Sequence, residues 1–283
     1  MERRPAIVTC VLTLIASLAG ALAWWHTLPV EDPAPLLGIL ESATTTLGLD
    51  AAPIAAGAAF LTVFVSWILL RRRLGEATAW YGAVAVAISP ALLASGSNVL
   101  VALLGALATW LAIDHVLRRD ATRALHLGVA CGLLATSSPE AILYALLILG
   151  IWVWRGRGRH VVWAIIGLAA VSAAVLATAG AGLDWLGIHP LSAGADLVQP
   201  WSLPWLAAAL VGAWSVRWPE RLAAAVAIAL PLAIAPSAAL PALAVAVLAG
   251  AGVHALVERA RWIGWPTGAA LAGSTVLWAV AGI

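Results

Sequence analysis

The chain alternates between long apolar runs and short arginine-rich segments. The runs show no alternation of polar and apolar residues, which excludes the strands of a membrane barrel and favours helices. A helix that crosses a membrane needs about 20 mostly apolar residues. The pattern therefore predicts an all-α, polytopic membrane bundle of about eleven helices. The predicted spans are about 6–25, 51–70, 77–95, 98–117, 122–137, 140–154, 161–182, 201–216, 221–235, 238–257 and 263–282.

Composition supports a membrane protein over a soluble one. Hydrophobic residues make up 63% of the 283 residues and charged residues only 10%, whereas soluble domains contain about 25% charged residues. We therefore expect a single transmembrane domain over residues 1–283, with no soluble domain. A net charge of +2 gives no reason to expect nucleic-acid binding.

The basic residues predict the orientation in the membrane. All fifteen are arginines, and short arginine-rich loops stay in the cytoplasm. We therefore predict a multi-pass protein of the cell (inner) membrane, with its amino terminus in the cytoplasm and its carboxyl terminus outside. The first span also matches a signal peptide ending at Ala21-Leu22-Ala23, and either interpretation leaves the next loop outside. The clusters are Arg3 and Arg4; Arg71, Arg72 and Arg73; Arg118, Arg119 and Arg123; Arg155, Arg157 and Arg159; Arg217 and Arg221; Arg259 and Arg261.

This topology places a set of acidic residues, and no arginine, on the outer side. Acidic residues have little influence on topology, so they could simply solvate the outer loops. The alternative is a cavity lined by carboxylates. The residues are Glu31, Asp32, Glu41, Asp50, Glu140, Asp184 and Asp196.

The first outer loop is the strongest candidate for a catalytic segment. Glu31 and Asp32 directly follow the first span, and residues 36–49 are expected to form a short interfacial helix. A carboxylate at the membrane surface can act as a general base toward an acceptor hydroxyl within hydrogen-bond reach. Adjacent acidic residues are also common in ordinary surface loops, so both interpretations stay open.

The turn between the fifth and sixth spans is predicted to lie below the membrane surface. Residues 124–154 must cross twice, which leaves arms of roughly 14 residues and 21 Å against a core of about 30 Å. The tip is Ser137-Ser138-Pro139-Glu140. Ser138 can cap the next helix, Pro139 suits its first position and Glu140 suits its positive end. A water-filled cavity that holds Glu140 is the alternative.

Two further polar residues are candidates for substrate binding. Asn98 either caps the fourth span or points into the same outer cavity, and His189 lies in an outer loop, about 184–200, that could cover this cavity. The histidines share no metal-ligand spacing, so we expect no metal site. The chain also lacks the usual nucleotide, dinucleotide and haem motifs, so we expect no cofactor.

The order of these features resembles the membrane half of the GT-C superfamily of glycosyltransferases, which use dolichyl- or undecaprenyl-phosphate sugars. The resemblance is strongest over residues 1–155. It rests on Glu31-Asp32 after the first span, the basic turn 71–76, Ser89-Pro90, the turn Gly96-Ser97-Asn98, the Gly-rich fifth span and Ser137-Ser138-Pro139. It implies Glu31 and Asp32 as catalytic carboxylates, and Asn98, Ser137, Ser138, Glu140 and His189 as substrate-binding candidates.

The chain departs from the family pattern at two turns. Asn98 stands where members usually have Asp, and Ser137 stands where they often have a Lys for the lipid phosphate. Three functions therefore stay open. The chain is a transferase that uses a polyprenyl-phosphate sugar, a non-catalytic scaffold or accessory subunit with protein partners in a membrane complex, or a small-solute transporter. In each case membrane lipids are expected to surround it.

Overall fold

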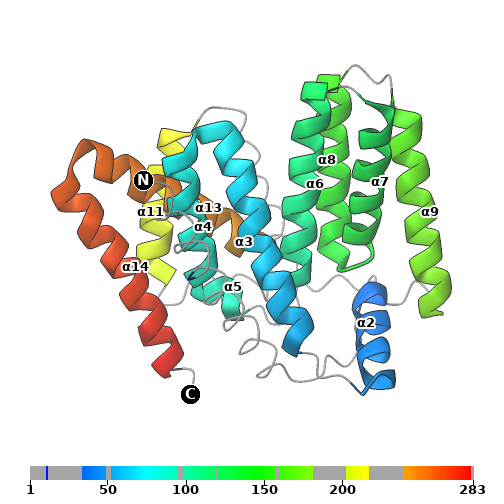
Figure 1. The fold of residues 1–283 in the computed structure, drawn as a ribbon, viewed down its shortest axis with the longest axis horizontal. Helices are drawn as coiled ribbons and strands as arrows, with labels where there is room; N and C mark the ends of the chain where they lie inside the picture. Colours follow the sequence, from blue (N-terminus) through cyan, green and yellow to red (C-terminus); the bar gives the residue numbers. More distant parts are fainter. Residues whose placement is uncertain are drawn as a thin grey trace.

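The computed structural model describes residues 11, 34–48, 52–94, 99–118, 120–156, 160–180, 202–216 and 239–281. Every regular element within these ranges is a helix, which confirms the all-α prediction for the described residues (Figure 1). Apart from residue 11, the predicted spans at 6–25 and 221–235 lie outside the described part. The helices are α2 Pro35–Thr46, α3 Ala52–Leu74, α4 Glu76–Ile88, α5 Pro90–Ala94, α6 Val99–Arg118, α7 Ala121–Ala135, α8 Pro139–Gly156, α9 Val161–Ala179, α11 Leu203–Ser215, α13 Ala239–Arg259 and α14 Arg261–Ala281.

Local sequence explains where several helices begin and end. Gly75 separates α3 from α4 with φ of 94°, a backbone conformation that only glycine adopts without strain. Ser89 precedes a proline and is therefore extended. It ends α4, and its Oγ accepts a hydrogen bond from the Leu92 amide at the start of α5. The segment predicted as one span at 77–95 is thus two helices, because Pro90 interrupts it.

The helices form two groups that share one interface. In Figure 1, α6, α7, α8 and α9 stand together with α2 below them, and α3, α4, α5, α11, α13 and α14 form the other group. Helix α6 packs against α3 and α13 and so joins the two groups. Leu127, Leu134 and Val101 are among the largest side chains that are fully buried between the helices.

Glycines allow the closest helix crossings in the described part. A Cβ atom added to Gly128 of α7 would overlap the carbonyl group of Ala164 on α9. In the same way, Gly212 of α11 lies against the Leu248 carbonyl of α13, and Gly252 lies against the Ala208 carbonyl. Small residues at such spacing let backbones approach closely in membrane bundles. Residues 242–252 of α13, which contain two close-packed glycines, are mostly buried.

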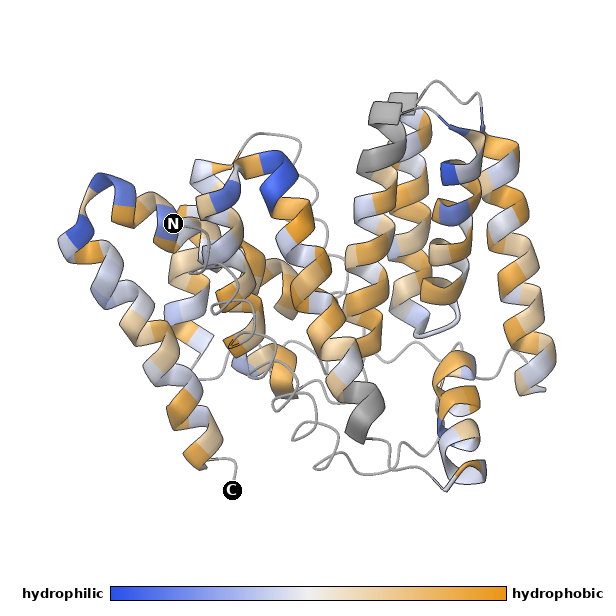
Figure 2. Ribbon diagram, in the orientation of Figure 1, coloured by the Kyte–Doolittle hydropathy of each residue, from blue (hydrophilic) through white to orange (hydrophobic). Residues whose placement is uncertain are grey.

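Helix α9 combines high hydropathy with high exposure. Two described helices, α9 and α13, are long and apolar enough to cross a membrane, with mean hydropathies of 2.3 and 2.1. Only 17% of the apolar stretch of α9 is buried, against 67% for α13. Figure 2 shows hydrophobic residues along most of the length of α9. A water-soluble protein rarely exposes so large an apolar surface.

Candidate functional site

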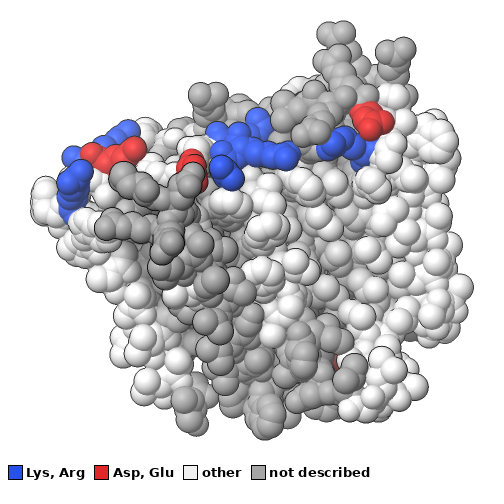
Figure 3. All heavy atoms as spheres, in the orientation of Figure 1, with Lys and Arg blue, Asp and Glu red and all other residues white. Residues whose placement is uncertain are grey.

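The described arginines gather at one edge of the bundle. They come from the end of α3, the start of α7 and the junction of α13 and α14, and Figure 3 shows them in a band along the upper edge of the molecule. We call this the arginine edge. Six clusters spread along the sequence were predicted to lie on one side of a membrane. The clusters with described side chains do meet on one side of the fold: Arg71, Arg72 and Arg73; Arg123; Arg259 and Arg261.

Tryptophan rings lie beneath two of these arginines. The Arg71 guanidinium carbon is 5.0 Å from the centre of the Trp67 ring, and that of Arg72 is 5.6 Å from the Trp110 ring. Such cation–π contacts contribute about 0.5–1 kcal/mol each at exposed sites. Tryptophan is enriched at membrane interfaces, where its amphipathic ring is stable.

The opposite end of the bundle joins the first predicted outer loop to the α7–α8 turn. The expected helix over 36–49 forms as α2, Pro35–Thr46, which packs against α9. The Leu36 amide donates a hydrogen bond to the Thr136 carbonyl oxygen over 3.0 Å. Helix α2 therefore contacts the turn predicted to lie below the membrane surface.

The two serines of this turn are buried. Ser137 is fully buried, and its hydroxyl donates to the Leu134 carbonyl oxygen over 2.7 Å. Ser138 is 4% exposed, and its Oγ makes no hydrogen bond within the described part of the chain. The predicted side-chain cap by Ser138 is therefore not formed. Its backbone carbonyl accepts from the Ala141 amide instead, and α8 begins at Pro139 as expected.

The remaining candidates are described only in part. Glu140 is the second residue of α8, and its side chain lies outside the described part. Glu31, Asp32, Asn98 and His189 also lie outside the described residues. The structure thus places Ser137, Ser138 and the start of α8 at the turn that α2 contacts through Leu36.

One pocket in the described part of the chain is apolar and separate from this turn. An open groove of about 510 Å³ runs along α8. Its lining contains no titratable group, so it offers apolar contact and no acid–base chemistry. The described residues also contain no group of three or more His, Cys, Asp or Glu side chains that could hold a metal ion. The lining residues are Leu143, Leu146, Leu147, Gly150, Ile151 and Trp154.

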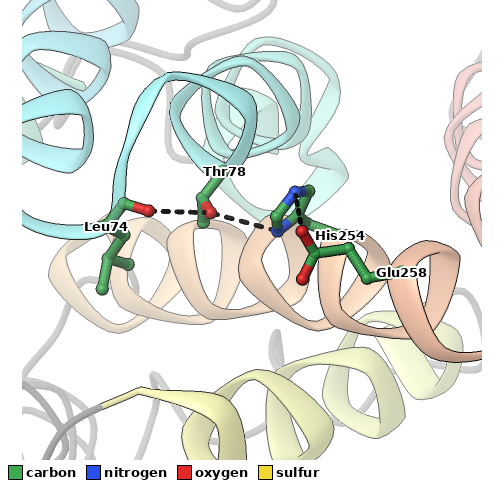
Figure 4. Close-up of polar contacts among 4 residues, drawn as sticks. All are labelled: Leu74, Thr78, His254 and Glu258. Carbon is green, nitrogen blue, oxygen red and sulfur yellow. Dashed lines mark hydrogen bonds and ion pairs between the residues drawn. The ribbon is translucent and has the colours of Figure 1, made fainter.

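One polar cluster lies near the arginine edge and was not identified from sequence. It joins Thr78 on α4 to His254 and Glu258 on α13 (Figure 4). The four-residue spacing of His254 and Glu258 is a sequence signal for a pair on one helix face. Thr78 is 176 positions away from His254, so only the fold reveals the third member.

Comparison with known proteins gave no match to any family model, curated protein or solved structure.

Proposed function

We propose that the chain is a multi-pass protein of the inner cell membrane, with the amino terminus and the arginine edge in the cytoplasm. The exposure of α9 supports this proposal, because an apolar helix of 19 residues, about 28 Å long, is stable in lipid and costly in water. The shared edge of the arginines supports the orientation. The end formed by α2 and the α7–α8 turn then faces outward.

At this outer end we propose a GT-C-like transferase that uses a polyprenyl-phosphate sugar. The observation that carries the proposal is the hydrogen bond from the Leu36 amide to the Thr136 carbonyl. Asp32 precedes Leu36 by four residues, and four residues of chain span at most about 14 Å. The candidate base and the candidate binding turn are therefore within reach of one substrate.

The chemistry requires one carboxylate and a bound donor. Asp32 or Glu31 accepts the proton of an acceptor hydroxyl, whose oxygen then attacks the anomeric carbon of the sugar. The bond between this carbon and the phosphate oxygen breaks, polyprenyl phosphate leaves, and the anomeric configuration is inverted. Asn98, Ser138, Glu140 and His189 are the proposed groups for binding and orienting the sugar.

A scaffold or accessory subunit is the second candidate. It is favoured by the burial of Ser137 and Ser138 and by the absence of any described arginine at the α2 end, where a lipid phosphate would bind. A scaffold needs packed helices and an apolar outer surface for partner helices, and it needs no polar cavity. The transporter alternative has no described observation that favours it over these two.

Native purification with mass spectrometry separates the two candidates. For the transferase we expect a polyprenyl-phosphate lipid to co-purify with the wild type, and the double variant Glu31→Gln/Asp32→Asn to lose sugar transfer by about 100-fold or more, the usual contribution of a general base. Ser42→Ala, an exposed change in α2, is the matched control and should retain activity. A stoichiometric protein partner without any polyprenyl lipid would overturn the transferase and support the scaffold.

A further inference from the structure

The apolar groove along α8 lies on the face of this helix that points away from the core. All of its lining residues belong to α8, and they recur at helical spacing from Leu143 to Trp154, so they share one face. Leu146 is 55% exposed and Trp154 is 80% exposed. The opposite face of α8 carries the residues that it buries in the core: Ala141, Tyr144, Ala145, Ile148 and Trp152.

Gly150 gives this groove its depth. It is exposed, and a Cβ added to it would meet no atom within 4 Å. The side chains of Leu147, Ile151 and Trp154 line the same groove, so the glycine leaves a hollow between larger apolar groups. The hollow, of about 510 Å³, offers apolar contact to a hydrocarbon chain.

The length of the groove matches the hydrocarbon part of one membrane leaflet. Leu143 and Trp154 are eleven positions apart (154 minus 143), which is about 16 Å along a helix. Half of a bilayer core is about 15 Å thick. A partner helix that crossed the whole core would make contacts over about 30 Å, twice the length of this groove. The groove therefore fits the acyl chain of a lipid in a single leaflet.

Positive charge is concentrated in the sequence next to the Trp154 end of the groove. Helices α7 and α8 pack against each other and are joined by a tight turn, so α8 ends where α7 begins (Figure 1). Arg123, near the start of α7, belongs to the arginine edge. Segments 118–123 and 155–159 contain six arginines and one acidic residue, Asp120. This charge favours an anionic lipid headgroup over a zwitterionic one.

We propose that α8 binds an anionic phospholipid of the cytoplasmic leaflet. One acyl chain lies in the groove over Gly150, and the phosphate lies at the Trp154 end, where segments 118–123 and 155–159 attract it. The site rests on the proposed membrane location and orientation. It does not depend on sugar transfer, which is proposed at the opposite end of α8.

The test is native mass spectrometry of the full chain in detergent micelles, titrated with dioleoyl phosphatidylglycerol or dioleoyl phosphatidylcholine. The two probes have the same acyl chains and differ in headgroup charge. We expect the wild type to bind phosphatidylglycerol about tenfold more tightly or better, because each arginine near an anionic headgroup contributes about fivefold. Equal affinity for the two lipids would overturn the proposal.

Gly150→Leu tests the groove itself. The new side chain occupies the hollow, and the position is open, so the variant is expected to fold. Its affinity for both lipids should fall about tenfold or more, because each buried methylene contributes about fourfold. Gly273→Leu on α14 is the matched control, since a Cβ added there also meets no atom within 4 Å. Equal phosphatidylglycerol binding by the two variants would contradict the proposed site.

The double variant Arg155→Gln/Arg157→Gln tests the charge separately. Its preference for phosphatidylglycerol should fall about fivefold or more, while its affinity for phosphatidylcholine should stay at the wild-type value. An unchanged preference would show that these arginines do not bind the headgroup and would overturn the proposal. All of these measurements report lipid binding alone, so their failure would leave the test of sugar transfer unaffected.

Discussion

Replacing Gly212 by valine is expected to destabilise the bundle by about 3 kcal/mol or more. Even the first added carbon would overlap the Leu248 carbonyl group and lie 2.9 Å from the Gly252 nitrogen. These neighbours are backbone atoms of α13, so a rotamer change cannot relieve the overlap. Overpacking a core costs about 1–3 kcal/mol when side chains can adjust, and the cost should reach or exceed the upper end here. Thermal unfolding of the purified protein in detergent measures it.

Gly273→Val is the matched control for this variant. Gly273 lies within α14, and a Cβ added there meets no atom within 4 Å. Valine also has a slightly better helix propensity than glycine. The control should therefore unfold within a few degrees of the wild type. Equal losses in the two variants would show that the α11–α13 crossing is not close-packed.

Introducing aspartate at Ala170 is expected to prevent stable insertion of α9. Ala170 is the central residue of this 19-residue helix and is exposed. A charged residue at the centre of a membrane-spanning helix costs about 2.5–3.5 kcal/mol, which corresponds to roughly a hundredfold change in the insertion equilibrium. On a surface in contact with water, the same substitution would cost only about 0.5 kcal/mol. A glycosylation-reporter assay of membrane insertion distinguishes the two cases.

Ala179→Asp gives the control at the end of the same helix. Ala179 is also exposed and is the last residue of α9, where the carboxylate can reach water. We expect normal insertion of this variant. If Ala170→Asp inserts as well as Ala179→Asp, then α9 does not cross a membrane.

Much of the helical arrangement could be predicted because it depends on local patterns. Arginine clusters end α3 and α13, and Pro139 begins α8, as the sequence indicates. The break at Ser89 shows the limit of counting apolar residues. The run around it is uniformly apolar, and only the effect of Pro90 on its preceding residue divides it into α4 and α5.

The candidate site could be predicted only in its parts. The sequence predicts a short helix after the first span and a buried turn before α8, and each prediction depends on nearby residues. Their contact through Leu36 and Thr136 joins positions 100 residues apart (136 minus 36). The contact between Thr78 and His254 also joins distant positions, so the sequence pattern does not predict it. Such contacts depend on how the helices pack against one another. The pattern of polar and apolar residues along the sequence does not specify this packing.

The central claim is that the arginine edge lies in the cytoplasm and the α2 end lies outside. It is tested most directly by labelling intact cells with a membrane-impermeant maleimide, in a background where Cys10 and Cys131 are replaced by serine. Thr46 on α2 and Glu76 at the arginine edge are both exposed. We expect Thr46→Cys to be labelled in intact cells and Glu76→Cys to be labelled only after permeabilisation. Labelling of Glu76→Cys in intact cells, with protection of Thr46→Cys, would contradict the proposed orientation.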